Sequence, residues 1–113
     1  MYQYEAYVKR VVDGDTLDLD IDLGFYMFAR IRVRLARINT PETFGVRKGS
    51  AEYKAGMKAK KFVKQLIEGQ TVMITTEKTG KFGRWIAEIN CGPNYEINLN
   101  DVLVEKGLAE LYG

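Results

Sequence analysis

The sequence contains no histidine and a single cysteine, Cys91, among its 113 residues. The absence of histidine excludes Ser–His and Cys–His catalytic pairs, imidazole metal ligands and acid–base chemistry by imidazole. A single cysteine cannot form an intrachain disulfide, and a zinc site built on thiolates is also excluded. Any chemistry carried by this chain must therefore use carboxylates, guanidinium groups, hydroxyls or a hard metal ion.

Long hydrophobic runs are missing as well, since the longest uninterrupted apolar stretch is only Phe25 to Ala29. No segment resembles a signal-peptide core or approaches the length of a membrane span. We therefore expect no membrane association and a cytoplasmic location, although an export signal removed from a longer precursor would leave the same sequence. The length predicts a single domain over residues 1–113, and the sequence does not predict an oligomeric state.

The charged residues are segregated along the chain, although the net charge is only +2. Five aspartates and no basic residue lie between Asp13 and Asp22. Seven basic residues, against Glu52 alone, lie between Arg47 and Lys64. This distribution suits a metal ion beside a polyanion, and it suits an ordinary solvated basic helix equally well.

Period-two patterns predict the first three strands. Residues 6–12 are expected to form a strand that ends at the turn dipeptide Asp13-Gly14. From Leu17 to Leu23 apolar residues alternate with aspartates, as in a half-buried strand. The aromatic segment 25–28 that follows is expected to pack locally on a barrel, with contact to substrate or to a second chain as the alternative. The third strand should face inward with Ile31, Val33 and Leu35, and outward with Arg30, Arg32 and Arg34. Its apolar phase then slips by one residue, which predicts a β-bulge after Leu35.

A helix is predicted next, capped by Ser50 and closed by Gly69. Its apolar stripe is expected to consist of Ala55, Ala59, Phe62 and Leu66, with Lys54, Lys58 and Lys61 on another face. Residues 72–77 and 85–91 read as a strand pair. A short second helix is expected to start near Asn98 or Asn100 and to stop at Gly107.

This order of three strands, a helix, two strands and a helix predicts a mainly β fold with α-helices, of the α+β kind. It fits a five-stranded OB-fold Greek-key β-barrel capped by helices.

Three short segments could carry chemistry. In Asp13-Gly14-Asp15-Thr16, Asp15 has the parity of the inward-facing residues, so it is either a metal ligand or a turn aspartate bonded to its own backbone. Glu42 follows a strand-ending proline, so it is either a general base or an ordinary loop residue. In Lys81-Phe82-Gly83-Arg84, the arginine could grip a phosphate and the phenylalanine could stack on a base, or the segment could simply be solvated.

Taken together, these segments resemble the staphylococcal nuclease family. The resemblance rests on Asp-Gly-Asp-Thr, Arg34 followed by Asn39-Thr40-Pro41-Glu42-Thr43, and Lys-Phe-Gly-Arg, in that order. It runs from about residue 8 to residue 109 and includes Val104 to Ala109 near the end.

The resemblance implies calcium-dependent hydrolysis of phosphodiester bonds in DNA or RNA, with single-stranded substrates expected. It makes Asp15 and Asn39 calcium ligands, together with Thr40 through its backbone carbonyl. It makes Glu42 the residue that orients or deprotonates the attacking water. It also makes Arg34 and Arg84 the clamp on the scissile phosphate, and it assigns contacts with the nucleic acid to Lys81, Phe82 and Tyr112.

The sequence departs from the family pattern at two of these positions. Asn39 stands where the family has a second acidic calcium ligand, which is expected to weaken calcium binding because affinity follows the charge of the ligands. Asp13 or Asp18 could supply the missing charge. Phe82 stands where the prototype has a tyrosine. These departures leave open an alternative, a weak or inactive barrel that binds nucleic acid or protein.

Overall fold

The computed structural model describes residues 2–76 and 85–111. Within these ranges the chain forms eight strands and two helices, in the order β1 (Tyr2–Asp13), β2 (Thr16–Asp22), β3 (Phe28–Leu35), β4 (Ile38–Asn39), α1 (Ala51–Ile67), β5 (Thr71–Thr76), β6 (Trp85–Cys91), β7 (Ile97–Asn98), α2 (Leu99–Glu105) and β8 (Glu110–Leu111). No described helix is both long enough and apolar enough to cross a membrane.

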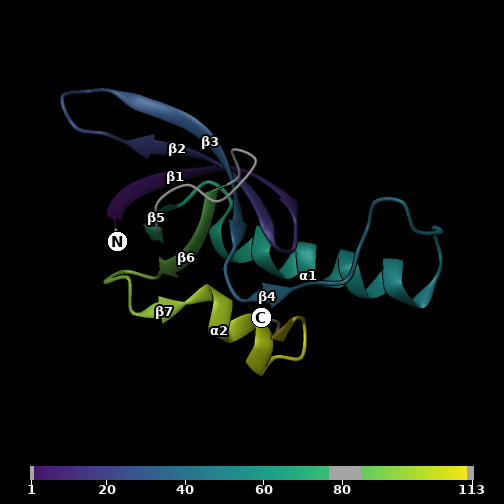
Figure 1. Cartoon of the computed structure of the whole chain (residues 1–113). Coiled ribbons are helices and arrows are strands. Elements are labelled where there is room, and N and C mark those ends of the chain that lie inside the picture. The colour runs from purple at the N-terminus through teal and green to yellow at the C-terminus, as the bar shows by residue number, and fades with distance from the viewer. Residues whose placement is uncertain (1, 77–84, 112–113) are drawn as a thin grey trace.

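Five of the strands close into a barrel, as Figure 1 shows. The sheet order is β3-β2-β1-β5-β6-β7, and β3 also pairs in parallel with β6 through the register Val33↔Trp85 to Leu35↔Ala87. This second pairing of β3 joins the two ends of the sheet, so the barrel consists of β1, β2, β3, β5 and β6. The predicted five-stranded OB-type barrel with helices is thus confirmed.

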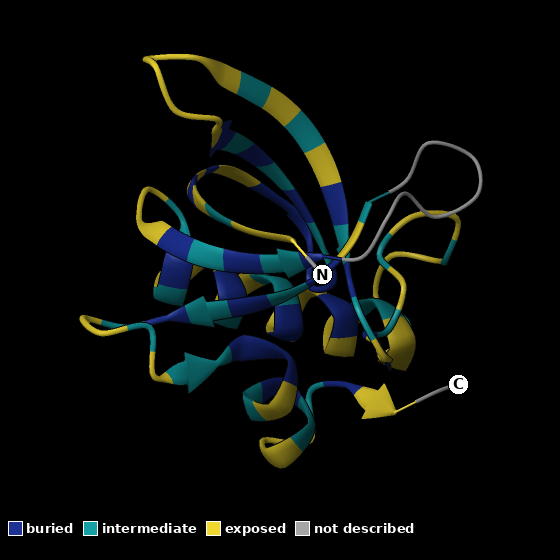
Figure 2. Ribbon diagram, turned by 60° about the vertical axis from the view of Figure 1, so that its left-hand side comes forward, coloured by how far each residue is buried: buried dark blue, intermediate teal, exposed yellow. Residues whose placement is uncertain are grey.

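The core fills the inside of this barrel, and its residues follow the predicted alternation. On β2, Leu17 and Leu19 are fully buried, while Asp18 and Asp20, which alternate with them, are partly exposed. Figure 2 shows the same alternation of buried and less buried positions along the strands. The inward phase of β3 also holds, with Val33 and Leu35 buried and Ile31 half-buried.

The bulge predicted after Leu35 is wrong, because the phase slip there is a turn between two sheets. β3 ends at Leu35, Arg37 adopts a left-handed φ of 68°, and β4 pairs with β8 in a separate two-stranded sheet. The register shifts lie instead in β1, between Val8 and Arg10 and between Val11 and Asp13. They bend a twelve-residue strand whose first half pairs with β5 and whose second half pairs with β2.

Helix α1 begins and ends as predicted, and its predicted stripe is confirmed in part, since Ala59 is buried and Phe62 and Leu66 pack against the core. The Ser50 hydroxyl accepts a hydrogen bond from the Tyr53 amide at 3.1 Å, and Gly69 follows the helix with a φ of 79°. The buried residues are Gly56, Ala59, Val63 and Ile67, whereas Ala55 is exposed and Phe62 and Leu66 are half-buried. The buried seam passes through a glycine, which hydrophobic periodicity does not count as apolar.

The predicted packing of residues 25–28 on the barrel is also wrong. The β2–β3 hairpin projects away from the barrel (Figure 1), and Phe25 and Tyr26 at its tip are 95% and 99% exposed. Both residues have positive φ angles, of 54° and 62°. The Met27 amide donates to the Gly24 carbonyl at 2.9 Å across this tight turn, which therefore needs no contact with the core.

Helix α2 is fastened to the barrel by polar contacts. Asn98 caps it, accepting a hydrogen bond from the Asp101 amide at 2.9 Å. The fully buried Asn100 accepts from the Ile89 amide and donates to the carbonyls of Ala36 and Ala87. This one side chain ties α2 both to β6 and to the turn that leads into β4.

Candidate active site

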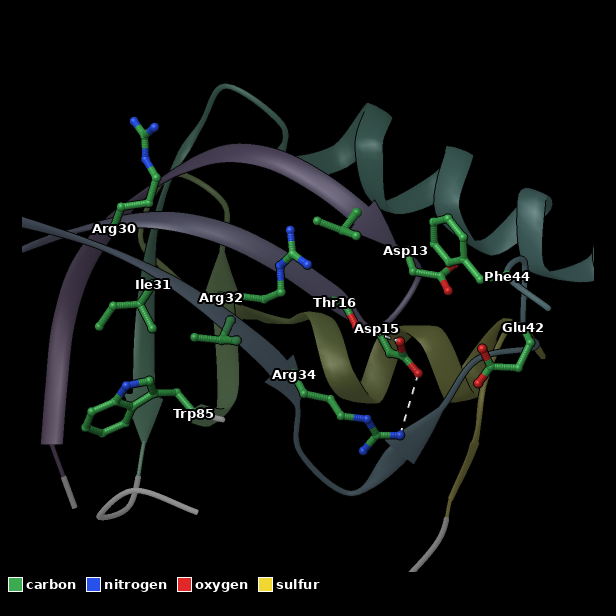
Figure 3. Close-up of a pocket in the computed structure, with 12 residues that line it drawn as sticks. Asp13, Asp15, Thr16, Arg30, Ile31, Arg32, Arg34, Glu42, Phe44 and Trp85 are labelled. Carbon is green, nitrogen blue, oxygen red and sulfur yellow. Dashed lines mark hydrogen bonds and ion pairs between the residues drawn. The ribbon is translucent and has the colours of Figure 1, made fainter. Parts of the chain in front are cut away.

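A cleft of about 670 Å³ opens where β2, β3 and the segment after β4 meet. Most of its lining side chains are charged or aromatic (Figure 3). The charged and aromatic ones are Asp13, Asp15, Arg30, Arg32, Arg34, Glu42, Phe44 and Trp85, and the others are Thr16 and the apolar Val12, Ile31 and Val33. Acidic and guanidinium groups therefore face one another across a single concave surface.

Asp15 lies at the turn between β1 and β2, with its carboxylate directed inward. Asp15 is buried, and its Oδ2 accepts a hydrogen bond from the Thr40 amide at 3.2 Å. Its Oδ1 lies 3.2 Å from the Thr16 hydroxyl, which donates to it. The carboxylate points inward, as expected from the parity of the strand, and the Thr40 amide and the Thr16 hydroxyl supply the hydrogen bonds that its burial requires.

Gly14 allows this turn to pack closely against its surroundings. A Cβ at position 14 would lie 2.9 Å from side-chain atoms of Thr40 and 3.0 Å from the Cβ of Ala59. Because real Cβ contacts are essentially never shorter than 3.0 Å, a larger residue at position 14 would force the Thr40 side chain or the turn itself to shift.

Arg34 reaches the same place from β3. It pairs with Thr16 in the β2–β3 ladder, so its side chain starts beside the Asp15 turn. The Arg34 Nη2 donates to Asn39 Oδ1 and lies 3.7 Å from Asp15 Oδ2. The predicted residues Asp15, Arg34 and Asn39 are therefore brought into direct contact.

Thr40 and Asn39 differ in their surroundings although they are neighbours. Asn39 is exposed at the end of β4, whereas Thr40 is buried. The Thr40 hydroxyl has no hydrogen-bond partner within the described part of the chain. A buried oxygen beside Asp15 therefore remains unused.

Glu42 lies on the segment that follows β4, and it is exposed on the rim of the cleft. In Figure 3 its carboxylate is turned toward Asp15 and Arg34. This segment is held by close packing against α1, since a Cβ at Gly56 would lie 2.6 Å from the Pro41 carbonyl oxygen and 3.0 Å from that of Glu42.

Asp13 contributes a second carboxylate to the cleft. Burial raises the pKa of its carboxyl group, and the nearby Asp15 raises it further, whereas the Gly14 amide, Thr43 and Lys60 lower it. Its Oδ1 accepts a hydrogen bond from the Gly14 amide at 2.9 Å. Asp18, the other residue considered for the missing charge, is instead paired with Arg32 at 2.8 Å on the hairpin.

The donor set fits a hard divalent cation in its chemistry. Asp13, Asp15, Asn39 and Thr40 offer carboxylate, amide, hydroxyl and carbonyl oxygens, the ligands that calcium prefers. However, the described residues hold no group of three or more His, Cys, Asp or Glu side chains arranged for a metal ion. The site is therefore suited to a cation but carries little negative charge to bind it.

Four of the residues singled out in the sequence, Lys81, Phe82, Arg84 and Tyr112, lie outside the described residues. Trp85, next to them in sequence, is half-buried and packs against the core while it lines the cleft.

The sequence did not point to two features of the cleft. Phe44, 64% exposed, lines it from an irregular loop, where no periodicity marks a residue. Gly56 lies within α1, outside every motif recognised in the sequence, and its close approach to the Pro41 carbonyl reveals that it supports the Glu42 segment.

Comparison with known proteins gives concordant matches. A family model described as staphylococcal nuclease homologue matches residues 32–113. The chain is 35% identical over 108 residues to a thermonuclease from Staphylococcus intermedius, covering 93% of this chain and 58% of that protein. It is 28% identical over 116 residues to endonuclease YhcR from Bacillus subtilis (strain 168), covering 97% of this chain and 9% of that protein.

A protein from Escherichia coli O157:H7 named as an uncharacterized endonuclease is 29% identical over 107 residues, with 93% of this chain and 59% of that protein covered. The chain thus spans between 9% and 59% of the length of these three relatives.

Proposed function

Because the chain belongs to the staphylococcal nuclease family, we propose that it is a calcium-dependent phosphodiesterase that hydrolyses single-stranded DNA or RNA. One observation carries this proposal. Arg34 lies between the Asp15 carboxylate and the Asn39 amide, and Glu42 lines the same cleft. Carboxylates and a guanidinium around one cleft are what phosphodiester hydrolysis needs in a chain without histidine.

Arg34 is proposed to hold the scissile phosphate. A guanidinium donates in a planar fork that matches two phosphate oxygens, and it stabilises the charge that grows on them during attack. Its contact with Asn39 and its ion pair with Asp15 limit the rotamers that it can adopt. Arg84 is the second guanidinium expected from the family pattern.

Glu42 is proposed to orient the attacking water and to accept its proton. An exposed carboxylate on the rim of the cleft can reach a water in line with the leaving oxygen. The packing of Gly56 against the backbone of Pro41 and Glu42 would hold this carboxylate in position.

Asp15, Asn39 and the Thr40 carbonyl are the residues proposed to hold calcium, with Asp13 as a further oxygen donor. A bound divalent cation would supply Lewis-acid stabilisation of the phosphate charge.

A nucleic-acid-binding barrel with little or no cleavage is the second candidate function. The observation that favours it is the neutral amide at Asn39, because losing one formal charge weakens the binding of a hard cation. In that case the chain would still bind nucleic acid but would not cleave it.

Digestion of single-stranded DNA and RNA tests the proposal, with calcium, magnesium or EDTA added in parallel. We expect cleavage with calcium and none with EDTA. Glu42→Gln should reduce the rate by about 100-fold or more, the usual contribution of a general base. Glu105→Gln, an exposed glutamate at the end of α2, is the matched control and should cleave normally. Binding without cleavage under all conditions would establish the second candidate instead.

A further inference from the structure

A second concave surface lies between the two helices, and it shares no lining residue with the cleft. It is a groove of about 430 Å³ lined by Lys58, Lys61, Phe62, Gln65, Lys106 and Leu108. We call it the lysine groove. Its three lysines are exposed, and no carboxylate is among its lining residues.

The charges of the lysine groove are not neutralised by ion pairs. Within residues 2–76 and 85–111, no carboxylate lies within ion-pair distance of its lysines. The arginines on the hairpin differ, since Arg30 and Arg32 are each paired at 2.8 Å with Asp20 and Asp18. A polyanion would therefore gain more from the lysine groove than from the hairpin.

The lysines are spaced suitably for a chain of phosphates. Lys58 and Lys61 of the groove lie three residues apart on one face of α1, so they are about 5–6 Å apart, and Lys54, outside the groove, continues the same face one turn earlier. Lys106 faces them from the end of α2, with its Nζ 5.7 Å from the centre of the Phe62 ring. The half-buried Phe62 adds an aromatic surface among these cations.

The lysine groove also lies close to the cleft along the chain. Asn39 of the candidate site pairs with Glu110 in the β4–β8 sheet, and Leu108 of the groove is two residues before Glu110. Two residues of chain span at most about 7 Å, whatever their conformation. A nucleic-acid strand that passes Asn39 of the candidate site therefore comes close to the groove.

We propose that the lysine groove binds the phosphate backbone of the nucleic-acid strand beyond the segment held in the cleft. This inference rests on the function proposed for the cleft. An anionic lipid surface fits less well, because Phe62 and Leu108 are half-buried and cannot insert into a bilayer as exposed apolar side chains do.

Counterion release makes the proposal quantitative. Each phosphate contact on a single strand contributes about 0.7 to the slope of log K against log salt. Replacing the three lysines by glutamine should therefore lower that slope by about 2. Between about 50 and 200 mM salt, the wild type should lose roughly 20-fold more affinity than the variant.

The experiment measures binding of fluorescent DNA single strands by anisotropy in EDTA across a salt series. One oligonucleotide has about 24 nucleotides, which exceeds the site of a single OB-fold, and the other has about 4. The test variant is Lys58→Gln/Lys61→Gln/Lys106→Gln. The control, Lys9→Gln/Arg10→Gln/Lys64→Gln, changes exposed residues outside the groove and lowers the net charge by the same three units. A variant with arginine at the three groove positions tests for a purely structural effect.

The expected result is a smaller slope for the groove variant on the long oligonucleotide only, with the control and the arginine variant close to wild type. An equal change in both glutamine variants, or an equal change on the short oligonucleotide, would overturn the proposal. Loss of binding to phosphatidylserine vesicles with unchanged DNA binding would also overturn it, in favour of a lipid surface.

The digestion assay separates the two proposals. If the short oligonucleotide is cleaved but the groove variant keeps the wild-type salt slope on the long one, the groove proposal is wrong and the nuclease proposal stands. If the salt slope falls in the groove variant but no oligonucleotide is cleaved, the nuclease proposal is wrong and the groove proposal stands.

Discussion

Arg34 and Asn39 are joined by a hydrogen bond from Nη2 to Oδ1, in which a guanidinium meets a neutral amide. The same nitrogen lies 3.7 Å from Asp15 Oδ2. One cation is thus shared between a carboxylate and an amide. The charge at position 39 therefore sets how much negative potential the site can offer to any further cation.

Asn39→Asp is expected to strengthen calcium binding by about tenfold, because ligand charge tunes the affinity of oxygen sites. Calcium titration by calorimetry measures this, and the rate of digestion at limiting calcium should rise with it. Asn94→Asp, in an exposed turn remote from the cleft, is the control and should leave calcium binding unchanged. An unaltered calcium affinity in Asn39→Asp would remove residue 39 from the metal site.

Gly56→Ala is expected to destabilise the protein by about 1–2 kcal/mol. The added Cβ meets the Pro41 carbonyl oxygen at 2.6 Å, and this crowding outweighs the gain in helix propensity. Urea unfolding measures the stability. Cleavage by the folded variant should also fall, since the clash displaces the Glu42 segment. Met57→Ala, at the next and partly exposed position, should change stability by less than about 0.5 kcal/mol.

The ion pair between Arg37 and Glu88 should make the stability of the fold depend on pH. Hydrogen bonds from Arg37 hold the pKa of the Glu88 carboxyl below its usual value of 4.5. A lowered pKa in the folded state means that the pair stabilises the protein above about pH 4.5, and that this contribution is lost as pH falls through the lowered value. Arg37 also bonds to Asp101, so the pair links β6 to α2.

Glu88→Gln should therefore lower the melting temperature by a few degrees at neutral pH, and the difference from wild type should narrow near pH 3. Thermal unfolding followed by circular dichroism at the two pH values measures both effects. Glu105→Gln, an exposed glutamate, should show neither. A constant difference at all pH values would mean that Glu88 acts through packing and not through its charge.

The tip of the β2–β3 hairpin should tolerate, and gain from, a change of turn residues. Positive φ angles at both central positions of a two-residue turn favour Asn-Gly, and large side chains there cost about 1–2 kcal/mol per residue. Phe25→Asn/Tyr26→Gly should therefore raise the free energy of unfolding by about 1 kcal/mol in urea. Phe28→Asn, which removes an exposed aromatic from a strand position, should not raise it. A loss of stability in the double variant would show that the aromatic side chains make contacts that stabilise the fold.

The alternation of apolar and polar residues predicted the burial of β2 and β3 correctly, for a physical reason. Alternation on β2 and β3 reflects the two faces of a strand, and one face of a closed barrel must be buried. The inward direction of Asp15 follows from the same parity, so its burial could be predicted along with that of Leu17 and Leu19. The contacts of Asp15 with the Thr40 amide and Arg34 could not, since they depend on where β4 leaves the barrel.

The buried face of α1 and the slip in apolar phase after Leu35 are two features that the local sequence pattern did not predict in full. The predicted stripe of Ala55, Ala59, Phe62 and Leu66 satisfies helical spacing. In the structure Ala59 is buried and Phe62 and Leu66 pack at the edge of the core, whereas Ala55 is exposed and the fully buried positions beside Ala59 are Gly56, Val63 and Ile67. Helical spacing alone cannot choose between two adjacent stripes, because the choice depends on what packs against the helix. The slip after Leu35 likewise has two possible causes, and the pairing of β4 with β8 identifies it as a turn.

The sequence alone determined the barrel class, the parity of its strands, the caps of the first helix and the set of residue types available for chemistry. These properties follow from local backbone geometry and from the hydrophobic effect, which act over a few residues at a time. The tertiary structure decided which of those residues share a cleft, that Gly56 supports the Glu42 segment, and that lysines from two separate helices line one groove. Such contacts join residues far apart in the chain, so their distances are set by the closure of the barrel and the docking of the helices.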